Sequence, residues 1–206
     1  LWEVDVAAKK VLRKMAVGVA PYAVVLSGGR AFVSNWGGRR VGEGDRSGPA
    51  GIGQVRVDAR NIASEGSVSV LELETGKSEA EIVTGPHASG LALRGDRLYV
   101  ACAAADRIEV IDVTKLEVVA KIDVRPRAGM PFGSAPNALA FAGDRLLVSN
   151  GTNNAVAVVS DGKVQGCVPV GWYPAGLAVS NGRVAVANVK GVGSRDKRRA
   201  KGWNVH

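Results

Sequence analysis

Short hydrophobic runs, separated by small turn residues, follow one another along almost the whole chain. The clearest pattern is a hydrophobic run, a two-residue break and a second hydrophobic run. It occurs four times without a gap, in residues 19–35, 86–102, 134–150 and 172–188. The breaks are Gly-Gly, Gly-Asp, Gly-Asp and Asn-Gly, which tolerate the positive φ of a tight hairpin turn. Each copy is therefore predicted to form a β-hairpin, whose strands we name A and B.

A second pair of hydrophobic runs follows the hairpin in most copies. In residues 107–124, runs rich in Val and Ile flank the turn-like pair Thr114-Lys115. The same arrangement, around a Gly-containing turn, recurs in residues 67–84 and 155–170. We name these strands C and D. Four short antiparallel strands per repeat, joined by hairpins, are typical of the blade of a β-propeller.

The repeats divide the chain into half a blade, three blades and half a blade. Residues 1–18 form a C–D pair without an A–B pair before it, and residues 172–188 form an A–B pair without a C–D pair after it. The predicted divisions of this single domain are 1–18, 19–85, 86–124, 125–171 and 172–188, with 189–206 as a basic tail. The fold class is thus all-β, a β-propeller of four-stranded antiparallel blades with about four blade equivalents.

Small residues recur at one position of strand A, where the four copies have Ala23, Gly90, Ala138 and Gly176. Strand A is the innermost strand of a blade, and blades crowd together toward the axis of a propeller. We therefore expect these small side chains to allow the backbones of neighbouring blades to approach closely.

Composition limits the possibilities further. The chain has 206 residues, of which 46% are hydrophobic, enough to bury the core of one domain. No run of about 18 apolar residues occurs, so no membrane span is predicted. No signal peptide is recognisable, and because the chain starts inside a blade we expect its natural N-terminus to lie upstream. Cys102 and Cys167 fall in different strands and are expected to be two separate, partly buried thiols.

Long connections are predicted on one face of the propeller. B–C and D–A loops emerge on the same face, and here they include residues 36–66 and 125–135. Loops of this length in a compact domain are usually functional or disordered. The candidate ligand-binding residues on this loop-bearing face are Asn35, Trp36, His87, Arg125, Arg127, Phe132, Asn150, Trp172, Tyr173 and Asn188. Aromatic and arginine side chains are common anchors of bound ligands.

These candidates have structural alternatives, which the sequence leaves open. Trp172 and Tyr173 could pack between blades instead of contacting a ligand. The asparagines at the ends of strand B could cap turns through their side chains. His87 stands alone beside a proline, and a lone histidine is seldom catalytic.

The net charge of +8 is unevenly distributed, because residues 190–201 alone contribute +5. This segment is the candidate polyanion-binding site. Its basic residues are Lys190, Arg195, Lys197, Arg198, Arg199 and Lys201. We favour a solvated basic loop, because no recognition helix, aromatic–basic sheet motif or zinc-finger spacing accompanies it. Nucleic acid is therefore not an expected partner.

No motif specifies a reaction. The two histidines, His87 and His206, are too few for an ordinary zinc site, and no G-x-S-x-G sequence occurs. Residues 42–48 are Gly-rich but lack the Lys-Ser/Thr ending of a phosphate-binding loop. Glu43 and Asp45 in this stretch are expected to face solvent rather than to hold a cation. The sequence therefore predicts no catalytic residue, no metal ligand and no cofactor.

The four strand-B sequences read GRAFVSN, DRLYVAC, DRLLVSN and GRVAVAN. They resemble the YVTN β-propeller repeat, a motif that specifies a fold and no chemistry. Residues 170–195 and 54–73 resemble bacterial YncE-like propellers that precede an alkaline-phosphatase-like phosphoesterase domain. The resemblance implies a periplasmic or extracellular protein, a ring of roughly seven blades and a downstream phosphoesterase domain. The chain holds no residues of that domain, so no catalytic or metal-binding residue is carried over.

The leading functional interpretation is a non-catalytic binding or scaffold module that takes a protein or a small ligand on the loop-bearing face. One alternative is an enzyme, either the propeller part of a phosphoesterase or a lactonase-like propeller with a channel metal near Asn35, Asn150 and Asn188. A second alternative is polyanion binding through residues 190–201. The incomplete blades would expose sheet edges, so we expect either closure within one chain or self-association.

Overall fold

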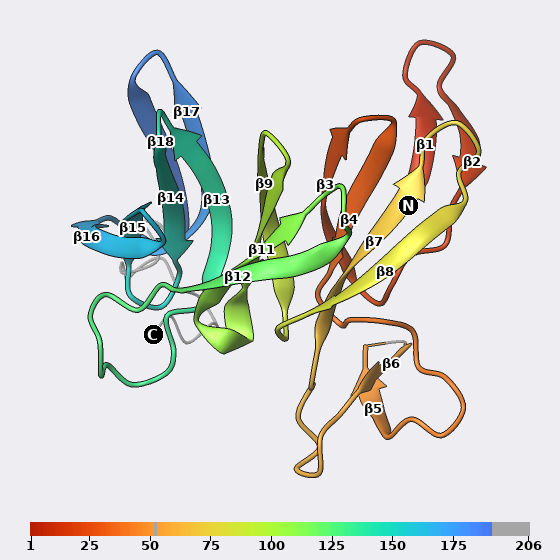
Figure 1. The fold of residues 1–206 in the computed structure, drawn as a ribbon, viewed down its shortest axis with the longest axis horizontal. Helices are drawn as coiled ribbons and strands as arrows, with labels where there is room; N and C mark the ends of the chain where they lie inside the picture. The colour runs from red at the N-terminus through yellow and green to blue at the C-terminus, as the bar shows by residue number, and fades with distance from the viewer. Residues whose placement is uncertain (52, 191–206) are drawn as a thin grey trace, which may run out of the picture.

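Antiparallel sheets make up the fold in the computed structural model, which describes residues 1–51 and 53–190 (Figure 1). Within these residues, three four-stranded sheets lie between two terminal hairpins. Each of the three sheets follows the strand order A to D of a blade, which confirms the predicted fold class. In this described part, the short 3-10 turn η1 (Ala103–Ala105) is the only helix. No helix there is long and apolar enough to cross a lipid bilayer.

The three complete blades follow one another along the chain. Blade 1 consists of β3 (Pro21–Ser27), β4 (Arg30–Asn35), β7 (Gly66–Glu72) and β8 (Ser78–Thr84). Blade 2 consists of β9 (Ala88–Arg94), β10 (Arg97–Cys102), β11 (Arg107–Asp112) and β12 (Glu117–Asp123). Blade 3 consists of β13 (Pro136–Ala142), β14 (Arg145–Asn150), β15 (Ala155–Ser160) and β16 (Lys163–Pro169). The two middle strands of each blade are the most buried, because they have a strand on either side.

Three two-stranded sheets complete the described fold. The terminal hairpins are β1 (Trp2–Asp5) with β2 (Lys10–Lys14), and β17 (Trp172–Ser180) with β18 (Arg183–Lys190). An additional hairpin, β5 (Ser47–Ala50) with β6 (Gly53–Arg56), lies within the connection between β4 and β7. The sequence pattern predicts a loop for that connection and misses the hairpin, because its Gly-rich and Pro-containing strands lack alternating hydrophobic residues. Figure 1 shows the two terminal hairpins at opposite ends of the row of blades.

The tight turns between strands A and B have the backbone conformations that the sequence predicts. Gly28 and Gly29 both have positive φ, at 55° and 76°. In the turn at Gly95-Asp96 only the glycine has positive φ, at 57°. The first turn therefore has the form of a type I′ hairpin, and the second matches type II′, which places glycine at its first central position.

The hydrophobic core is divided into clusters that lie between neighbouring elements of the row. Phe32 of blade 1 packs in one cluster with Leu98 of blade 2. Ile108 of blade 2 packs in another cluster with Val148 of blade 3. A smaller cluster joins Val17, which follows β2, to blade 1. Each blade thus depends on its neighbours for the burial of its faces.

The small residues of strand A serve close packing where a neighbouring blade is present. A Cβ atom added to Gly90 in β9 would lie 2.9 Å from the Cα atom of Ala138 in β13, closer than real Cβ atoms come to other atoms. Gly176 occupies the same place in the terminal strand β17. There an added Cβ would meet only the Cβ of Ala187, 3.2 Å away in its own hairpin. The close approach therefore comes from the next blade along the row.

The residue three places before the small strand-A residue has a left-handed backbone in all four copies. The φ values are 53° at Ala20, 60° at His87, 50° at Ala135 and 53° at Tyr173. None of these residues is glycine or asparagine, which adopt this conformation at little cost. The sequence therefore gives no local signal for the feature, which ends each D–A connection.

Candidate functional site

The two longest connections lie on the same side of the row of blades. Figure 1 shows the insertion that carries β5 and β6 at one end of this side and the loop of residues 125–135 nearer the other end. The turns at the ends of β9 and β17 lie on the opposite side. This loop-bearing face collects most of the candidate residues, because strand B ends there and strand A begins there.

Two aromatic candidates from neighbouring blades stack on each other. Trp36 directly follows β4, and His87 directly precedes β9. Their ring centroids are 3.6 Å apart and their planes differ by 13°. Burial lowers the pKa of His87, so its imidazole is neutral at pH 7. Because the Trp36 side chain remains 39% exposed, the stack presents a flat aromatic surface at the junction of blades 1 and 2.

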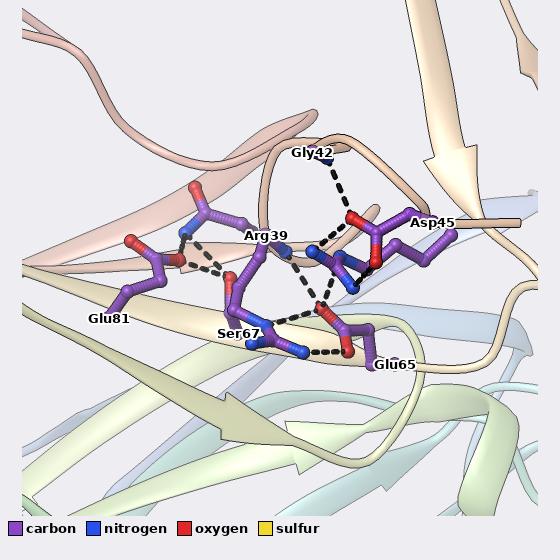
Figure 2. A network of polar contacts seen from close by, with 8 residues as sticks. Arg39, Gly42, Asp45, Glu65, Ser67 and Glu81 are labelled. Carbon is purple, nitrogen blue, oxygen red and sulfur yellow. Dashed lines mark hydrogen bonds and ion pairs between the residues drawn. The ribbon is translucent and has the colours of Figure 1, made fainter. Parts of the chain in front are cut away.

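Ion pairs join separate parts of the insertion to one another, as Figure 2 shows. Arg39 donates hydrogen bonds from Nε and Nη2 to the Glu65 carboxylate, at 2.9 and 2.8 Å. Arg56 pairs with Asp45 and approaches Glu65, with 3.6 Å between Nε and Oε1. Burial disfavours the Glu65 anion, but hydrogen bonds from Arg39 outweigh this effect and lower the pKa of Glu65. The charges of the insertion are thus largely paired with one another.

A second polar network lies beneath the same connection and includes Asn35, the last residue of β4. Asn35 Nδ2 donates to Ser69 Oγ at 2.8 Å and to Glu81 Oε1 at 3.1 Å. Ser67 also donates to the Glu81 carboxylate (Figure 2). Asn35 is fully buried. Its amide therefore connects β4 to β7 and β8 rather than facing solvent.

The other two candidate asparagines occupy different environments. Asn150 is fully buried, and its Nδ2 donates to the Val124 carbonyl oxygen at 2.7 Å, which joins blade 3 to blade 2. Asn188 is exposed near the end of β18. The environment at this repeat position thus depends on whether strands C and D of the same blade are present.

A buried carboxylate anchors the loop of residues 125–135. Asp106 accepts hydrogen bonds from the backbone N–H groups of Gly133, Ser134 and Ala135, at 2.6, 2.7 and 3.2 Å. Its side chain comes from the left-handed residue that follows η1, and the residue is 3% exposed. Asn154 has the same place in blade 3 and accepts the Tyr173 N–H at 2.9 Å. Sequence reasoning missed this pair, although the repeat alignment places a polar side chain at both positions.

The anchored loop borders a hollow that is lined by basic, acidic and aromatic side chains. The hollow, about 420 Å³ in volume, is lined by Arg107, Arg125 and Phe132 among others. Arg125 donates to both Asp123 oxygens and, at 3.1 Å, to the Met130 carbonyl oxygen. Its hydrogen bond with Asp123 raises the pKa of Arg125. Phe132 is 67% exposed, which makes it the most accessible aromatic candidate of this face.

The remaining candidates lie in the same loop and at the C-terminal hairpin. Arg127 is exposed in the same loop. Trp172 and Tyr173 begin β17, where Lys190 Nζ lies 6.0 Å from the Trp172 ring centroid. A Cβ added to Gly151 would meet the Tyr173 ring at 2.8 Å, so this ring covers the backbone of blade 3, as the packing alternative expects. Of the candidate polyanion site, Lys190 is described, whereas Arg195, Lys197, Arg198, Arg199 and Lys201 lie outside the described residues.

The ionisable groups of this face hold its loops in place. Asp106 binds backbone N–H groups, and Glu65 and Asp45 bind arginines. Glu43, the other carboxylate of the Gly-rich stretch, is exposed. Within residues 1–51 and 53–190, no three His, Cys, Asp or Glu side chains are grouped closely enough to hold a metal ion. The arrangement offers aromatic and basic contact surface on anchored loops.

Comparisons with known proteins support the fold. No protein-family model matches the chain, and no curated protein sequence matches it. Among solved structures, it is similar to hydrazine synthase from Kuenenia stuttgartiensis, with a TM-score of 0.59 and 23% identity over 86% of this chain and 45% of that one. It is also similar to BamB from Moraxella catarrhalis, with a TM-score of 0.57 and 10% identity over 90% of this chain and 47% of that one.

A designed protein shows the same likeness at a different length. The computationally designed Ika4 protein has a TM-score of 0.53 and 11% identity, over 85% of this chain and 94% of that one. The chain thus spans about half the length of the two natural chains and most of the length of the designed one. These similarities support the fold that the sheet order indicates, a β-propeller arrangement of four-stranded blades.

Proposed function

We propose that this chain is a non-catalytic binding module that takes a protein or a small ligand on the loop-bearing face. The observation that carries the proposal is the exposed aromatic surface of Trp36 and Phe132. Both side chains belong to connections that contacts with other residues hold in place. Trp36 is held by its stack on His87, and the Phe132 loop is held by Asp106. Rigid aromatic side chains lose little conformational entropy on binding and are common hot spots.

The charges of the face suggest which ligands it would accept. Arg107 and Arg125 border the hollow beside Phe132, and exposed Arg127 lies in the same loop. Arg107 is already paired with Glu109, and Arg125 with Asp123. The face therefore combines apolar contact area with partly neutralised basic groups, which suits a ligand with aromatic or aliphatic groups and a modest negative charge.

The test is a selection from a phage-displayed random peptide library against the 206-residue chain. We expect selected peptides to lose about tenfold or more in affinity on Trp36→Ala or Phe132→Ala, the usual cost of removing a hot spot. Val168→Ala in the outer strand β16 is the matched control, because Val168 is also apolar and 54% exposed but lies in an outer strand. A selection that yields no binder, or peptides that bind all three variants equally, would contradict the proposal.

We also propose that the chain is the propeller portion of an exported YVTN and YncE-like protein that continues into a phosphoesterase domain. The support is the resemblance of the four strand-B sequences and of residues 170–195 and 54–73. Sequencing the gene that encodes the chain tests this assignment. We expect a leader sequence upstream and a phosphoesterase domain downstream. A gene that lacks both would contradict the assignment.

A further inference from the structure

The two exposed aromatic side chains of the proposed binding face bound one continuous strip. Trp36 stacks on His87, and the His87 carbonyl oxygen accepts a hydrogen bond from the Ala103 N–H at 3.0 Å. Ala103 begins η1, whose last residue, Ala105, lines the same hollow as Phe132. Figure 1 shows the coil of η1 between the insertion that carries β5 and β6 and the loop that contains Phe132. The three half-buried alanines of η1 thus form an apolar floor between the two aromatic anchors.

This strip lies within the part of the row that consists of complete blades. Residues 36–65 connect two strands of blade 1, and residues 103–106 connect two strands of blade 2. His87 lies between blades 1 and 2, and residues 124–135 join blade 2 to blade 3. The connections that form the strip therefore begin and end at strands that are paired within their own blades.

The hollow in this strip presents more positive than negative charge to a ligand. Its lining cations are Arg107, Lys121 and Arg125, and 61% of the Lys121 side chain is in solvent. Of the two lining carboxylates, Asp106 is 3% exposed and already accepts three backbone N–H groups. The other, Asp123, is exposed, but Arg125 Nε donates to both of its oxygens. A ligand would therefore meet Arg107 and Lys121 without an equal number of accessible carboxylates.

A buried carboxylate holds Arg107 in place at the wall of the hollow. Arg107 Nε donates to Glu109 Oε1 at 2.8 Å, and Arg107 Nη2 lies 2.7 Å from the same oxygen. The Glu109 side chain is 3% exposed and also accepts the Gly85 N–H at 3.1 Å, so a ligand cannot reach it. Arg107 Nη1 takes no part in these contacts. A guanidinium held in this way can bind a carboxylate at a low cost in conformational entropy.

We propose that the strip binds an extended acidic peptide segment of a protein partner, an inference that rests on the proposed binding function. Apolar side chains of the segment cover Trp36 and Phe132, and an Asp or Glu between them enters the hollow beside Arg107 and Lys121. Residues 121–135, which form one wall, contain three basic residues and one acidic residue, so the charge of the segment is complementary. An extended segment contacts both aromatic anchors, whereas a small ligand in the hollow contacts Phe132 alone.

The test uses the peptides that the phage selection returns. We expect them to carry Asp or Glu between apolar residues more often than the unselected library does. The tightest-binding peptide is synthesised in two forms, one unchanged and one with Asn and Gln in place of Asp and Glu. The affinity of each form for the 206-residue chain is measured by fluorescence anisotropy. The acidic form is expected to bind more tightly by about two- to fivefold, as for an exposed ion pair.

Lys121→Gln tests the hollow itself. It is expected to weaken binding of the acidic form by about two- to fivefold and to leave binding of the neutral form unchanged, which also shows that the variant is folded. Lys163→Gln is the matched control, because Lys163 is an exposed lysine of another D strand but begins that strand, β16, whereas Lys121 lies near the end of β12. Arg107 is not substituted, because its loss would leave Glu109 buried without its partner.

The outcomes distinguish this inference from the function on which it rests. The expected result is one acidic peptide that loses affinity on Trp36→Ala, on Phe132→Ala and on Lys121→Gln. A selection without binders would contradict the binding function itself. Peptides that need both aromatic side chains but bind equally well in the neutral form would keep that function and overturn the acidic partner. Peptides that need only one of the two aromatic side chains, or that lose as much affinity on Lys163→Gln as on Lys121→Gln, would overturn the inference as well.

Discussion

The complete blades and the terminal hairpins share a sequence pattern but differ in burial. Strand β18 has the hydrophobic pattern of β10, yet Leu98 in β10 is fully buried and its counterpart Val184 is 44% exposed. Asn35 and Asn150 are likewise fully buried, whereas Asn188 is exposed. The strand pattern specifies the hairpin in both regions. Burial is decided by the strand and the blade that lie beside it.

Removal of a large side chain from strand B should separate the two regions most clearly. Leu98→Ala is expected to lower the free energy of unfolding by about 2–5 kcal/mol, because it leaves a cavity between blades 1 and 2. Val184→Ala should cost less than about 1 kcal/mol, since the side chain is already half in solvent. Both losses are measured by chemical denaturation. Equal losses would contradict the comparison.

An added methyl group in strand A should give the second-largest difference in stability between the two regions. Gly90→Ala forces a Cβ against the backbone of β13 and is expected to cost about 1–3 kcal/mol. Gly176→Ala in β17 meets only the Cβ of Ala187 in its own hairpin and should be close to neutral. The thermal unfolding midpoints of the two variants provide the measurement. A Gly90→Ala chain as stable as its parent would show that the blades can move apart.

Substitutions in the D–A connections should show a smaller difference in the free energy of unfolding between the two regions. Asp106→Ala removes the acceptor of three backbone N–H groups at the entry to blade 3, and the expected cost is about 1–3 kcal/mol. Asn154→Ala removes the acceptor of one N–H at the entry to the terminal hairpin, with an expected cost of about 1 kcal/mol or less. Hydrogen exchange at Ser134 and Tyr173 would report each loss locally. A larger increase in the exchange rate at Tyr173 on Asn154→Ala than at Ser134 on Asp106→Ala would contradict the expected order.

Thiol reactivity should report the same contrast with little effect on stability. Burial raises the pKa of Cys102 to about 12, so this thiol should not react with a maleimide at pH 8 in the folded chain. The second thiol, Cys167, is half-buried, so it is first replaced by alanine to remove its own reaction with the maleimide. An Asn188→Cys substitution in that background introduces a thiol at the repeat position of Cys102. This thiol should be labelled rapidly, because Asn188 is exposed, and mass spectrometry would follow the reaction. Equal labelling rates for the two positions would contradict the contrast.

The repeat pattern was sufficient to predict the strands, because hairpin turns and hydrophobic runs are local features. Gly28-Gly29 and Gly95-Asp96 mark their turns through backbone preferences that a single residue carries. The left-handed conformations of Ala20 and Tyr173 were not predictable in this way. Their backbones are set by the D–A connection, through contacts such as that of Tyr173 with Asn154.

The candidate site was predicted only in part for a related reason. Trp36 and His87 were candidates on account of their loops, but their stacking depends on the spacing of two blades. Asp106 was missed because its role depends on a loop 27–29 residues later in the chain. The pairing of Arg39 with Glu65 required the β5–β6 hairpin to bring the two ends of the insertion together. Such long-range contacts have no local sequence signal.

The placement of hydrophobic clusters between blades has a consequence for cooperativity. Each blade interacts with its nearest neighbours only, so the free energy of the molecule approximates a sum of terms along a line. Blade 2 has a large buried cluster on both sides, whereas one of the two clusters of blade 1 is small. Blade 2 should therefore be the last part to open, with amide exchange quickening toward either end. A linear array of this kind opens from its ends inward, so local opening of a terminal hairpin should leave the blades beyond its neighbour closed.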